Sequence, residues 1–217
     1  MQNFAVIFDM DGVIVDSEPM YQNWNHQLFE ELNITVPVQI RSQFVGISPK
    51  RKWHLIKEHC GITESIEELV LNQRRFFGDK SVNFKDILFP GTLPLLELLK
   101  GKGIKLALAS SSDRERINSV LSSCDLVKYF DEIVSGHEFE ESKPHPDIFL
   151  HTAKKLGIEP EECIVIEDSI YGLTAATRAG MKKVGVKHKR IPMDLSLADI
   201  TIESLEELNY EALENLL

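Results

Sequence analysis

Cysteine is scarce in this 217-residue chain, because only Cys60, Cys124 and Cys163 are present and they lie far apart. An odd number at such wide spacing excludes a disulfide framework and offers no metal-binding pattern. We therefore expect a reducing, cytoplasmic setting. A basic leader is also missing, and the apolar stretch at residues 4–8 is too short for a signal-peptide core. No apolar run reaches the length of a membrane-spanning helix, so we expect no membrane association.

Positive charge is in short supply as well, with 24 Lys and Arg residues against 34 Asp and Glu residues. The resulting net charge of −10 disfavours general binding to nucleic acids or anionic membranes. An anionic substrate must therefore be held by a local positive group. The remaining composition is that of an ordinary globular protein. We expect a monomer whose partner is a small molecule.

Short apolar runs rich in β-branched residues recur along the chain and predict buried parallel strands. The strongest runs lie at 4–9, 104–110, 163–168 and 182–186, and weaker ones at 131–135 and 198–202. Helical patterns lie between them, at 92–103, 113–124, 146–157 and 169–180. This alternation is typical of an α/β protein with a doubly wound parallel sheet, the Rossmann-like arrangement.

The segment 17–87 interrupts this alternation, because it contains no buried-strand pattern. Apolar residues from Met20 to Leu28 recur at helical spacing. A Ser-Pro pair at 48–49 starts a second helix, and a capping box at 65–68 starts a third. We expect a small all-helical cap domain, residues 17–87, inserted after the first strand of a core domain formed by residues 1–16 and 88–217.

Polar residues follow several of the predicted strands, at the edge where doubly wound sheets bind their ligands. Two acids follow the first strand, hydroxyl groups follow the second, and an acidic pair ends the strand at 163–168. A lysine precedes the helix at 146–157. These residues are Asp9, Asp11, Ser110, Ser111, Glu167, Asp168 and Lys143.

The types of these residues favour phosphoryl transfer. Carboxylates together with a substrate phosphate suit Mg²⁺, which prefers hard oxygen ligands. Hydroxyl and backbone N–H groups at a helix start bind anions, and a lysine adds a point charge. One carboxylate can form an aspartyl-phosphate, and a second acid can protonate the leaving oxygen and later deprotonate water.

Four segments, "DMDGVIVDS", "LASSS", "SKPHPDIF" and "IEDSIYG", resemble in sequence and order the four motifs of the haloacid dehalogenase-like phosphohydrolases. The helical insert resembles the small cap of that family, and the resemblance covers essentially the whole chain. The most similar subgroup is the β-phosphoglucomutase-like one, which includes many sugar-phosphate phosphatases.

The resemblance implies catalytic roles for the acidic residues. Asp9 resembles the nucleophile and a Mg²⁺ ligand. Asp11 resembles the general acid/base, with its backbone carbonyl on the metal. Asp168 resembles the distal metal ligand, while Glu167 is either a further ligand or a residue that supports one.

The phosphate-binding roles fall on a second group of residues. Ser110 resembles the phosphate-binding hydroxyl, with Ser111 beside it, and Lys143 resembles the lysine that steadies both nucleophile and phosphate. Asp113 has a simpler interpretation as the N-cap of the following helix.

The cap departs from the mutase pattern. A histidine of the β-phosphoglucomutases is replaced by Tyr21, and a lysine and an arginine of their cap loop are replaced by Val45 and Pro49. We therefore favour a phosphatase over a mutase, which is the alternative.

Four cap residues are candidate substrate contacts: Tyr21, Gly46, Lys50 and Arg51. The basic run 50–52 lies in the first turn of a helix, where cations are slightly unfavourable. It either forms a solvated face or supplies one residue to the substrate.

Two further classes compete with an enzyme. A signalling receiver domain also uses a phosphorylated aspartate, but its acidic pair precedes that aspartate in the chain. A catalytically inactive binding protein of the same fold is disfavoured because every catalytic position is filled. We expect a Mg²⁺-dependent phosphohydrolase for a small phosphorylated metabolite, a sugar or polyol phosphate.

Overall fold

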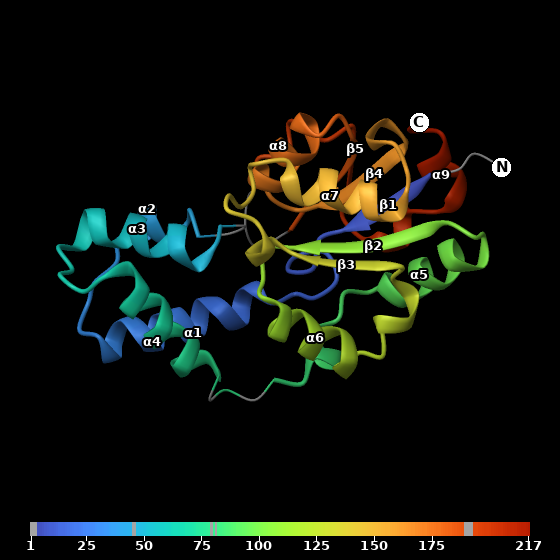
Figure 1. Ribbon diagram of the computed structural model, residues 1–217. Helices are drawn as coiled ribbons and strands as arrows, with labels where there is room; N and C mark the ends of the chain where they lie inside the picture. Colours follow the sequence, from blue (N-terminus) through green and yellow to red (C-terminus); the bar gives the residue numbers. More distant parts are fainter. Residues whose placement is uncertain (1–3, 45–46, 79, 81, 189–192) are drawn as a thin grey trace. The chain divides into compact units, whose positions relative to one another are not determined.

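The computed structural model describes residues 4–44, 47–78, 80, 82–188 and 193–217 (Figure 1). The chain forms two compact units. The core unit comprises Met1–Asp16 and Phe84–Leu217, and the helical unit comprises Ser17–Asn83. The sequence places the second boundary slightly later, at residue 87, because the short 3-10 turn η1 (Phe84–Ile87) has no recognisable pattern.

A six-stranded parallel sheet with the order β3-β2-β1-β4-β5-β6 forms the centre of the core unit. All six strands were predicted, including the two weaker candidates. Their bounds are β1 Ala5–Phe8, β2 Lys105–Ser110, β3 Glu132–Ser135, β4 Cys163–Glu167, β5 Lys182–Val186 and β6 Ile200–Ile202. This order is that of the doubly wound Rossmann-like fold, which confirms the predicted fold class.

Helices cover both faces of the sheet, because alternate strand residues point to opposite sides. α7 (Asp147–Leu156) and α8 (Ile170–Arg178) cover one face, where Ile7 joins Phe149 in a buried cluster. α5 (Thr92–Gly101) and α6 (Arg114–Ser123) cover the other face (Figure 1). There Phe8 meets Phe130, with ring centroids 6.1 Å apart.

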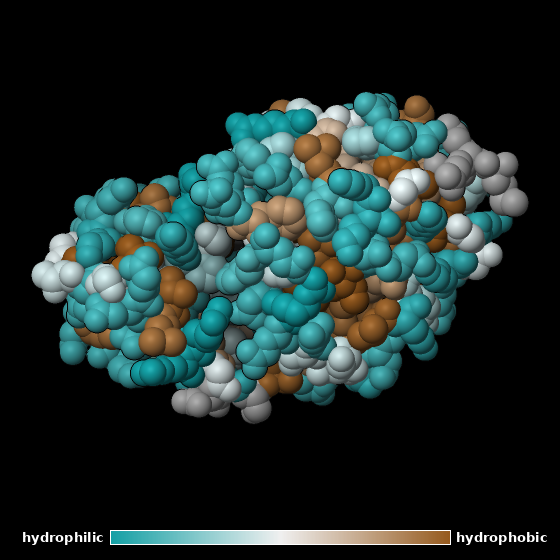
Figure 2. Space-filling model, in the orientation of Figure 1, coloured by the Kyte–Doolittle hydropathy of each residue, from teal (hydrophilic) through white to brown (hydrophobic). Residues whose placement is uncertain are grey.

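Several short elements complete the core unit, and the sequence patterns did not predict them. They are η2 Val127–Tyr129, η3 Gly136–Glu138, η4 Pro160–Glu162, η5 Leu205–Glu207 and α9 Tyr210–Glu214. None of the described helices has the length and apolar character needed to cross a bilayer. The face seen in Figure 2 carries mainly hydrophilic residues, with apolar ones in separate groups.

The helical unit has its own hydrophobic core, built by Phe29, Trp53, Ile56 and Leu69 among others. The Trp53 indole N–H donates to Gln73 Oε1 at 2.8 Å, so this buried polar group is satisfied. The helices are α1 Glu18–Glu31, α2 Val38–Arg41, α3 Pro49–Cys60 and α4 Ile66–Gly78. The three predicted helices are confirmed, and α2 was not predicted.

Local signals explain where these helices begin and end. The Ser48 hydroxyl caps α3 by accepting from the Arg51 backbone N–H, and Gly61 ends α3 with φ 64°. The capping box between Ser65 and Glu68 is formed as predicted. Ser17 stands at the N-cap position of α1, but its side chain makes no capping hydrogen bond.

The two chain segments that lead from the core unit into the helical unit run side by side. An antiparallel bridge joins Val15 to Leu88. The Asp16 N–H donates to the Ile87 carbonyl at 2.7 Å, and the Phe89 N–H donates to the Ile14 carbonyl at 3.0 Å. Both connections therefore leave the core unit from one place.

Candidate active site

The candidate site lies at the carboxyl edge of the central strands. β1 and β4 are neighbours, and the strand order reverses between them, which is where doubly wound sheets bind ligands. Asp9 follows β1 directly, Asp168 follows β4, and β2 ends at Ser110. The Asp9 N–H donates to the Ile166 carbonyl at 3.0 Å, so the ladder continues up to the first aspartate.

Lys143 joins the acids of β1 and β4. Its Nζ donates to Asp9 Oδ1 at 2.6 Å and to Glu167 Oε1 at 2.8 Å. The third donor meets the Ala109 carbonyl at 3.0 Å, at the end of β2. The ammonium is thus fully satisfied by three neighbouring strand ends, and the structure brings together the lysine and two of the predicted acids.

Glu167 is engaged at both carboxylate oxygens. Oε1 accepts from Lys143, while Oε2 accepts from the Asp168 and Ser169 N–H groups at 2.9 Å each and from the Ser169 hydroxyl. The start of α8 packs tightly against this carboxylate, because a Cβ at Gly172 would lie 1.7 Å from Glu167 Oε1. Glu167 therefore fixes Lys143 and the first turn of α8.

The buried acids carry more negative charge than Lys143 can compensate. Burial raises the pKa of Asp9 well above its usual range; Lys143 opposes this, and Glu167 and Asp168 add to it. Burial also raises the pKa of Asp168 to about 6. Burial would lower the pKa of Lys143, but the Asp9 and Glu167 carboxylates outweigh it and raise that pKa. An additional cation would stabilise this site.

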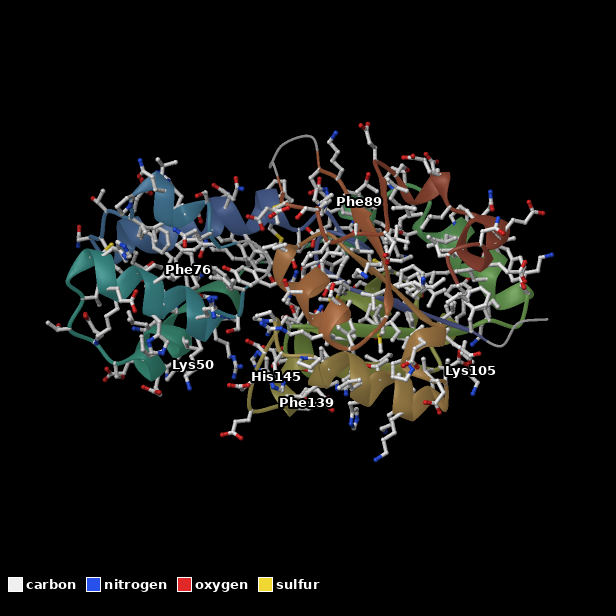
Figure 3. The ribbon with its side chains drawn as sticks, turned by 90° about the horizontal axis from the view of Figure 1, so that it is seen from above. Lys50, Phe76, Phe89, Lys105, Phe139 and His145 are labelled. Atoms are coloured by element: carbon white, nitrogen blue, oxygen red, sulfur yellow. The ribbon has the colours of Figure 1, made fainter. Side chains whose placement is uncertain are left out.

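Asp168 has a partner that the sequence motifs did not reveal. His188 Nε2 lies 3.1 Å from Asp168 Oδ2, and the same imidazole hydrogen-bonds the backbone of Gly12. Phe89, labelled in Figure 3, stacks on His188 with ring centroids 5.4 Å apart. Gly12 must be glycine, because it has φ 92° and a Cβ there would lie 2.0 Å from Asp168 Oδ2.

The side chain of Asp11 turns to a different set of groups. Its Oδ2 accepts from the Ser112 hydroxyl at 2.8 Å, and its Oδ1 accepts from Arg116 Nη2 at 2.7 Å. Both partners belong to the loop and first turn of α6, and their contact with Asp11 was not predicted. The four predicted acids therefore do not form one cluster of side chains. Among the described residues, the structure contains no group of three or more His, Cys, Asp or Glu residues placed to hold a metal ion.

The serines after β2 start the loop that leads into α6. Ser110 is buried and its hydroxyl accepts from the Ser112 N–H at 3.1 Å, while Ser111 is partly exposed. Asp113 caps α6 by accepting from the Arg116 N–H at 2.9 Å, as predicted. The hydroxyl and N–H groups of this loop lie at the same sheet edge as Asp9.

The candidates in the helical unit have different environments. The Tyr21 ring contacts those of Trp24 and Phe77, with centroids 5.8 and 5.7 Å away. Lys50, labelled in Figure 3, and Arg51 are exposed on the first turn of α3. Gly46 lies outside the described residues.

Lys52 does not belong to a solvated face, which was one of the two interpretations of the basic run 50–52. It is buried, its Nζ donates to Asn25 Oδ1 at 2.6 Å, and the Phe77 ring centroid lies 5.6 Å from Nζ. Burial lowers its pKa to about 7, and the charge of Glu18 only partly opposes this. The signal was available in the sequence, because position 52 is one helical turn before the buried Ile56.

The fold and the site define the class of the protein. It is a doubly wound α/β enzyme with acids and a lysine at the point where the strand order reverses. Residues 6–186 match the family model described as haloacid dehalogenase-like hydrolase. The chain belongs to this family, as the four sequence motifs suggested, and not to the receiver domains.

Relatives with assigned activities support a phosphatase. The phosphorylated carbohydrates phosphatase of Thermotoga maritima is 35% identical over 85% of each chain. Hexitol phosphatase B of Escherichia coli K12 is 30% identical over 98% of this chain and 97% of its own. A crystal structure of β-phosphoglucomutase from Clostridium difficile superposes with a TM-score of 0.83 at 27% identity, covering 98% of this chain and 96% of that one. The protein is a phosphatase of the haloacid dehalogenase-like family.

Proposed function

We propose that the protein hydrolyses a sugar or polyol phosphate through an aspartyl-phosphate on Asp9, with Mg²⁺ as cofactor. The observation that carries the proposal is the Asp9–Lys143 pair at the carboxyl end of β1, with Nζ 2.6 Å from Oδ1. The names of two relatives, a phosphorylated carbohydrates phosphatase and a hexitol phosphatase, support this substrate class.

Each step uses residues of the core unit. An Asp9 carboxylate oxygen attacks the phosphorus, the bond from phosphorus to the leaving oxygen breaks, and Asp11 gives that oxygen a proton. In the second step water attacks the phosphorus, Asp11 takes a proton from the water, and the bond to Asp9 breaks to release inorganic phosphate.

Lys143 and the loop after β2 hold the phosphate. When phosphate binds, the Lys143 ammonium exchanges one of its three hydrogen bonds for a phosphate oxygen, while Glu167 keeps it in place. Ser110 and Ser111 offer hydroxyl and N–H groups next to the start of α6. These donors neutralise the charge of the transferred group.

The donor set fits Mg²⁺, which binds one or two carboxylates, substrate phosphate and water. We assign Asp9, Asp168 and the backbone carbonyl of Asp11 as its ligands. Glu167 stays either a further ligand or a residue that supports one, and its hydrogen bonds to Lys143 and to the start of α8 favour the supporting role. Bound Mg²⁺ would supply positive charge that keeps Asp9 ionised and stabilises the phosphoryl group.

The helical unit, in this proposal, acts as a cap that excludes water and recognises the leaving group. The adjacent connections at Val15 and Leu88 are its hinge. We retain Tyr21, Gly46, Lys50 and Arg51 as candidate contacts to the leaving group.

Two variants, and the activity of the wild type in excess EDTA, test the proposal directly. Asp9→Asn should lower kcat by at least about 10³-fold while thermal stability is kept or raised, because one buried negative charge is removed. Asp11→Asn should still release a good leaving group once and then accumulate the phospho-enzyme. Substantial activity of Asp9→Asn, or full activity in excess EDTA, would contradict the proposal.

The mutase alternative is supported by the likeness to a β-phosphoglucomutase structure. Tyr21 argues against it, because a phenol with a pKa near 10 cannot exchange protons as imidazole does at neutral pH. Given β-glucose 1-phosphate and a trace of the bisphosphate, the protein should release inorganic phosphate or leave the sugar unchanged. Formation of glucose 6-phosphate without phosphate release would establish the mutase.

A further inference from the structure

The carboxylate of Asp11 is held at both of its oxygens, by Ser112, the last residue of the LASSS motif, and by Arg116, which lies outside the four motifs. The Ser112 hydroxyl donates to Oδ2 at 2.8 Å and Arg116 Nη2 donates to Oδ1 at 2.7 Å. A guanidinium–carboxylate contact of this length is strong and directional. The side chains of Asp11 and Arg116 are 27% and 17% exposed, so the pair is shielded without being sealed from substrate.

The elements that carry these donors are themselves fixed. Arg116 lies in the first turn of α6, where its backbone N–H is capped by Asp113 at 2.9 Å. Its guanidinium lies over the Phe84 ring, 5.5 Å from the centroid. Ser112 is tied to the end of β2 through its N–H, which donates to Ser110. The two donors thus hold Asp11 relative to the loop that we assign to the phosphate.

We propose that Arg116, assisted by Ser112, is a positioning residue that aligns Asp11 for proton transfer to the leaving oxygen. This inference rests on the proposed function, in which Asp11 is the general acid. Without Arg116, the Asp11 carboxylate would lose its charged donor on Oδ1 and would be freer to rotate about its side-chain bonds. Proton transfer requires hydrogen-bond reach to the leaving oxygen, so a rotating carboxyl group spends less time in productive geometry.

The loss of kcat/KM in a variant without Arg116 should depend on how much the leaving group needs a proton. Nitrophenolate departs readily without one, whereas phenolate, whose conjugate acid has a pKa of about 10 as in tyrosine, depends more on the acid. p-Nitrophenyl phosphate and phenyl phosphate have similar shapes, so the ratio of their kcat/KM values isolates the acid. Because kcat/KM ends at release of the first product, the later attack of water does not affect this ratio.

The test measures this ratio, nitrophenyl over phenyl, for wild type and five variants. Arg116→Ala should raise the ratio about 10-fold, Ser112→Ala less, and Asp11→Asn most, within the 10²–10⁴-fold range of general acid catalysis. Arg116→Lys should restore part of the loss. Arg114→Ala is the matched control, because Arg114 lies on the same turn but contacts the Ile133 carbonyl and Glu138. Its ratio should equal that of wild type.

The outcomes separate the inference from the function on which it rests. An unchanged ratio in Arg116→Ala, together with a raised ratio in Asp11→Asn, would overturn the positioning role alone. Equal losses on both substrates, or a raised KM with an unchanged ratio, would also overturn it and indicate a structural or phosphate-binding role. An unchanged ratio in Asp11→Asn would refute Asp11 as the acid, and the inference with it. If Arg116→Ala unfolds, Arg116→Lys and Ser112→Ala decide by the same ratio.

Discussion

Lys143 of the core unit and Lys52 of the helical unit are both buried, 3% and 6% exposed, but their surroundings are opposite. Lys143 donates to two carboxylates and one carbonyl. Within the described residues Lys52 has one hydrogen-bond acceptor, Asn25, and otherwise faces the rings of Phe44, Trp53 and Phe77. The pKa is raised for Lys143 and lowered to about 7 for Lys52.

The difference follows from what compensates desolvation. Burial disfavours the charged form of both lysines. Direct ion pairs with carboxylates compensate this desolvation for Lys143 but not for Lys52. The core unit therefore keeps its lysine charged, as a group that binds phosphate must be. In the helical unit the cost of burial is not compensated in this way, and it lowers the pKa of Lys52 to about 7.

The largest effect should come from Lys143→Met. This change leaves Asp9 and Glu167 buried without their cation, which typically costs about 3–5 kcal/mol of stability. The phosphate also loses its lysine, so kcat on p-nitrophenyl phosphate should fall by about 10³-fold or more. Urea unfolding and steady-state kinetics measure both effects. A variant of unchanged stability would mean that Lys143 is not needed to compensate the acids.

Lys52→Met should have a smaller effect that depends on pH. The folded pKa of about 7 is below the unfolded value of about 10.4, so between these values the unfolded chain binds a proton that the folded chain lacks. Stability of wild type relative to the variant should therefore rise with pH, by about 2–3 kcal/mol from pH 7 to 9. Below pH 7 the full cost of the buried charge is present.

Urea unfolding of both proteins at several pH values from 6 to 9.5 measures this difference. Subtracting the variant removes contributions common to both, such as those of the buried cysteines. A flat difference across this range would show that Lys52 stays charged in the folded protein, and the contrast with Lys143 would then disappear.

The sequence predicted the parts of the site that strand ends determine. Asp9, Ser110 and Asp168 each follow a strong apolar run, and parallel strands place their carboxyl ends at one edge. Lys143 was a candidate because it precedes the predicted helix at 146–157, and the resemblance to the family then implied its role. The centre of the sheet was predictable because β1 and β4 are buried on both faces and therefore appear in the sequence as short apolar runs.

The side-chain contacts that were not predicted depend on the directions in which individual side chains point, which the sequence pattern does not give. Arg116 lies on α6, whose apolar pattern predicts which face of the helix is buried. That pattern does not indicate what a polar residue such as Arg116 contacts, so its contact with Asp11 was not predicted. His188 follows β5 with no periodic pattern around it. The burial of Lys52 was not predicted, because a charged residue on a buried helix face is uncommon, although Trp53 and Ile56 mark that face.

Asn25→Asp should convert the environment of Lys52 into one like that of Lys143. The new carboxylate would take the place of the Asn25 amide oxygen, 2.6 Å from Nζ, and raise the pKa of Lys52. Stability at pH 7 should rise by about 1 kcal/mol, and the pH dependence between 7 and 9 should weaken. Asn23→Asp makes the same change at an exposed position of α1 and should neither raise the stability at pH 7 nor weaken its pH dependence. A destabilised Asn25→Asp protein, unfolded by urea at pH 7, would show that the ion pair does not offset its own desolvation.

The smallest change in stability is expected for the exposed neighbours of Lys52. Lys50→Ala and Arg51→Ala should each alter the free energy of unfolding by less than about 0.5 kcal/mol, because both residues are exposed on the surface. If the helical unit recognises the leaving group, one of them should raise KM severalfold or change the order of preferred substrates, with kcat on p-nitrophenyl phosphate nearly unchanged. Glu58→Ala, exposed on the same helix, is the matched control. The measurement is kcat and KM across a panel of sugar and polyol phosphates with Mg²⁺. If both variants match wild type on every accepted substrate, recognition does not use this turn of α3, and Lys50 and Arg51 only solvate the surface.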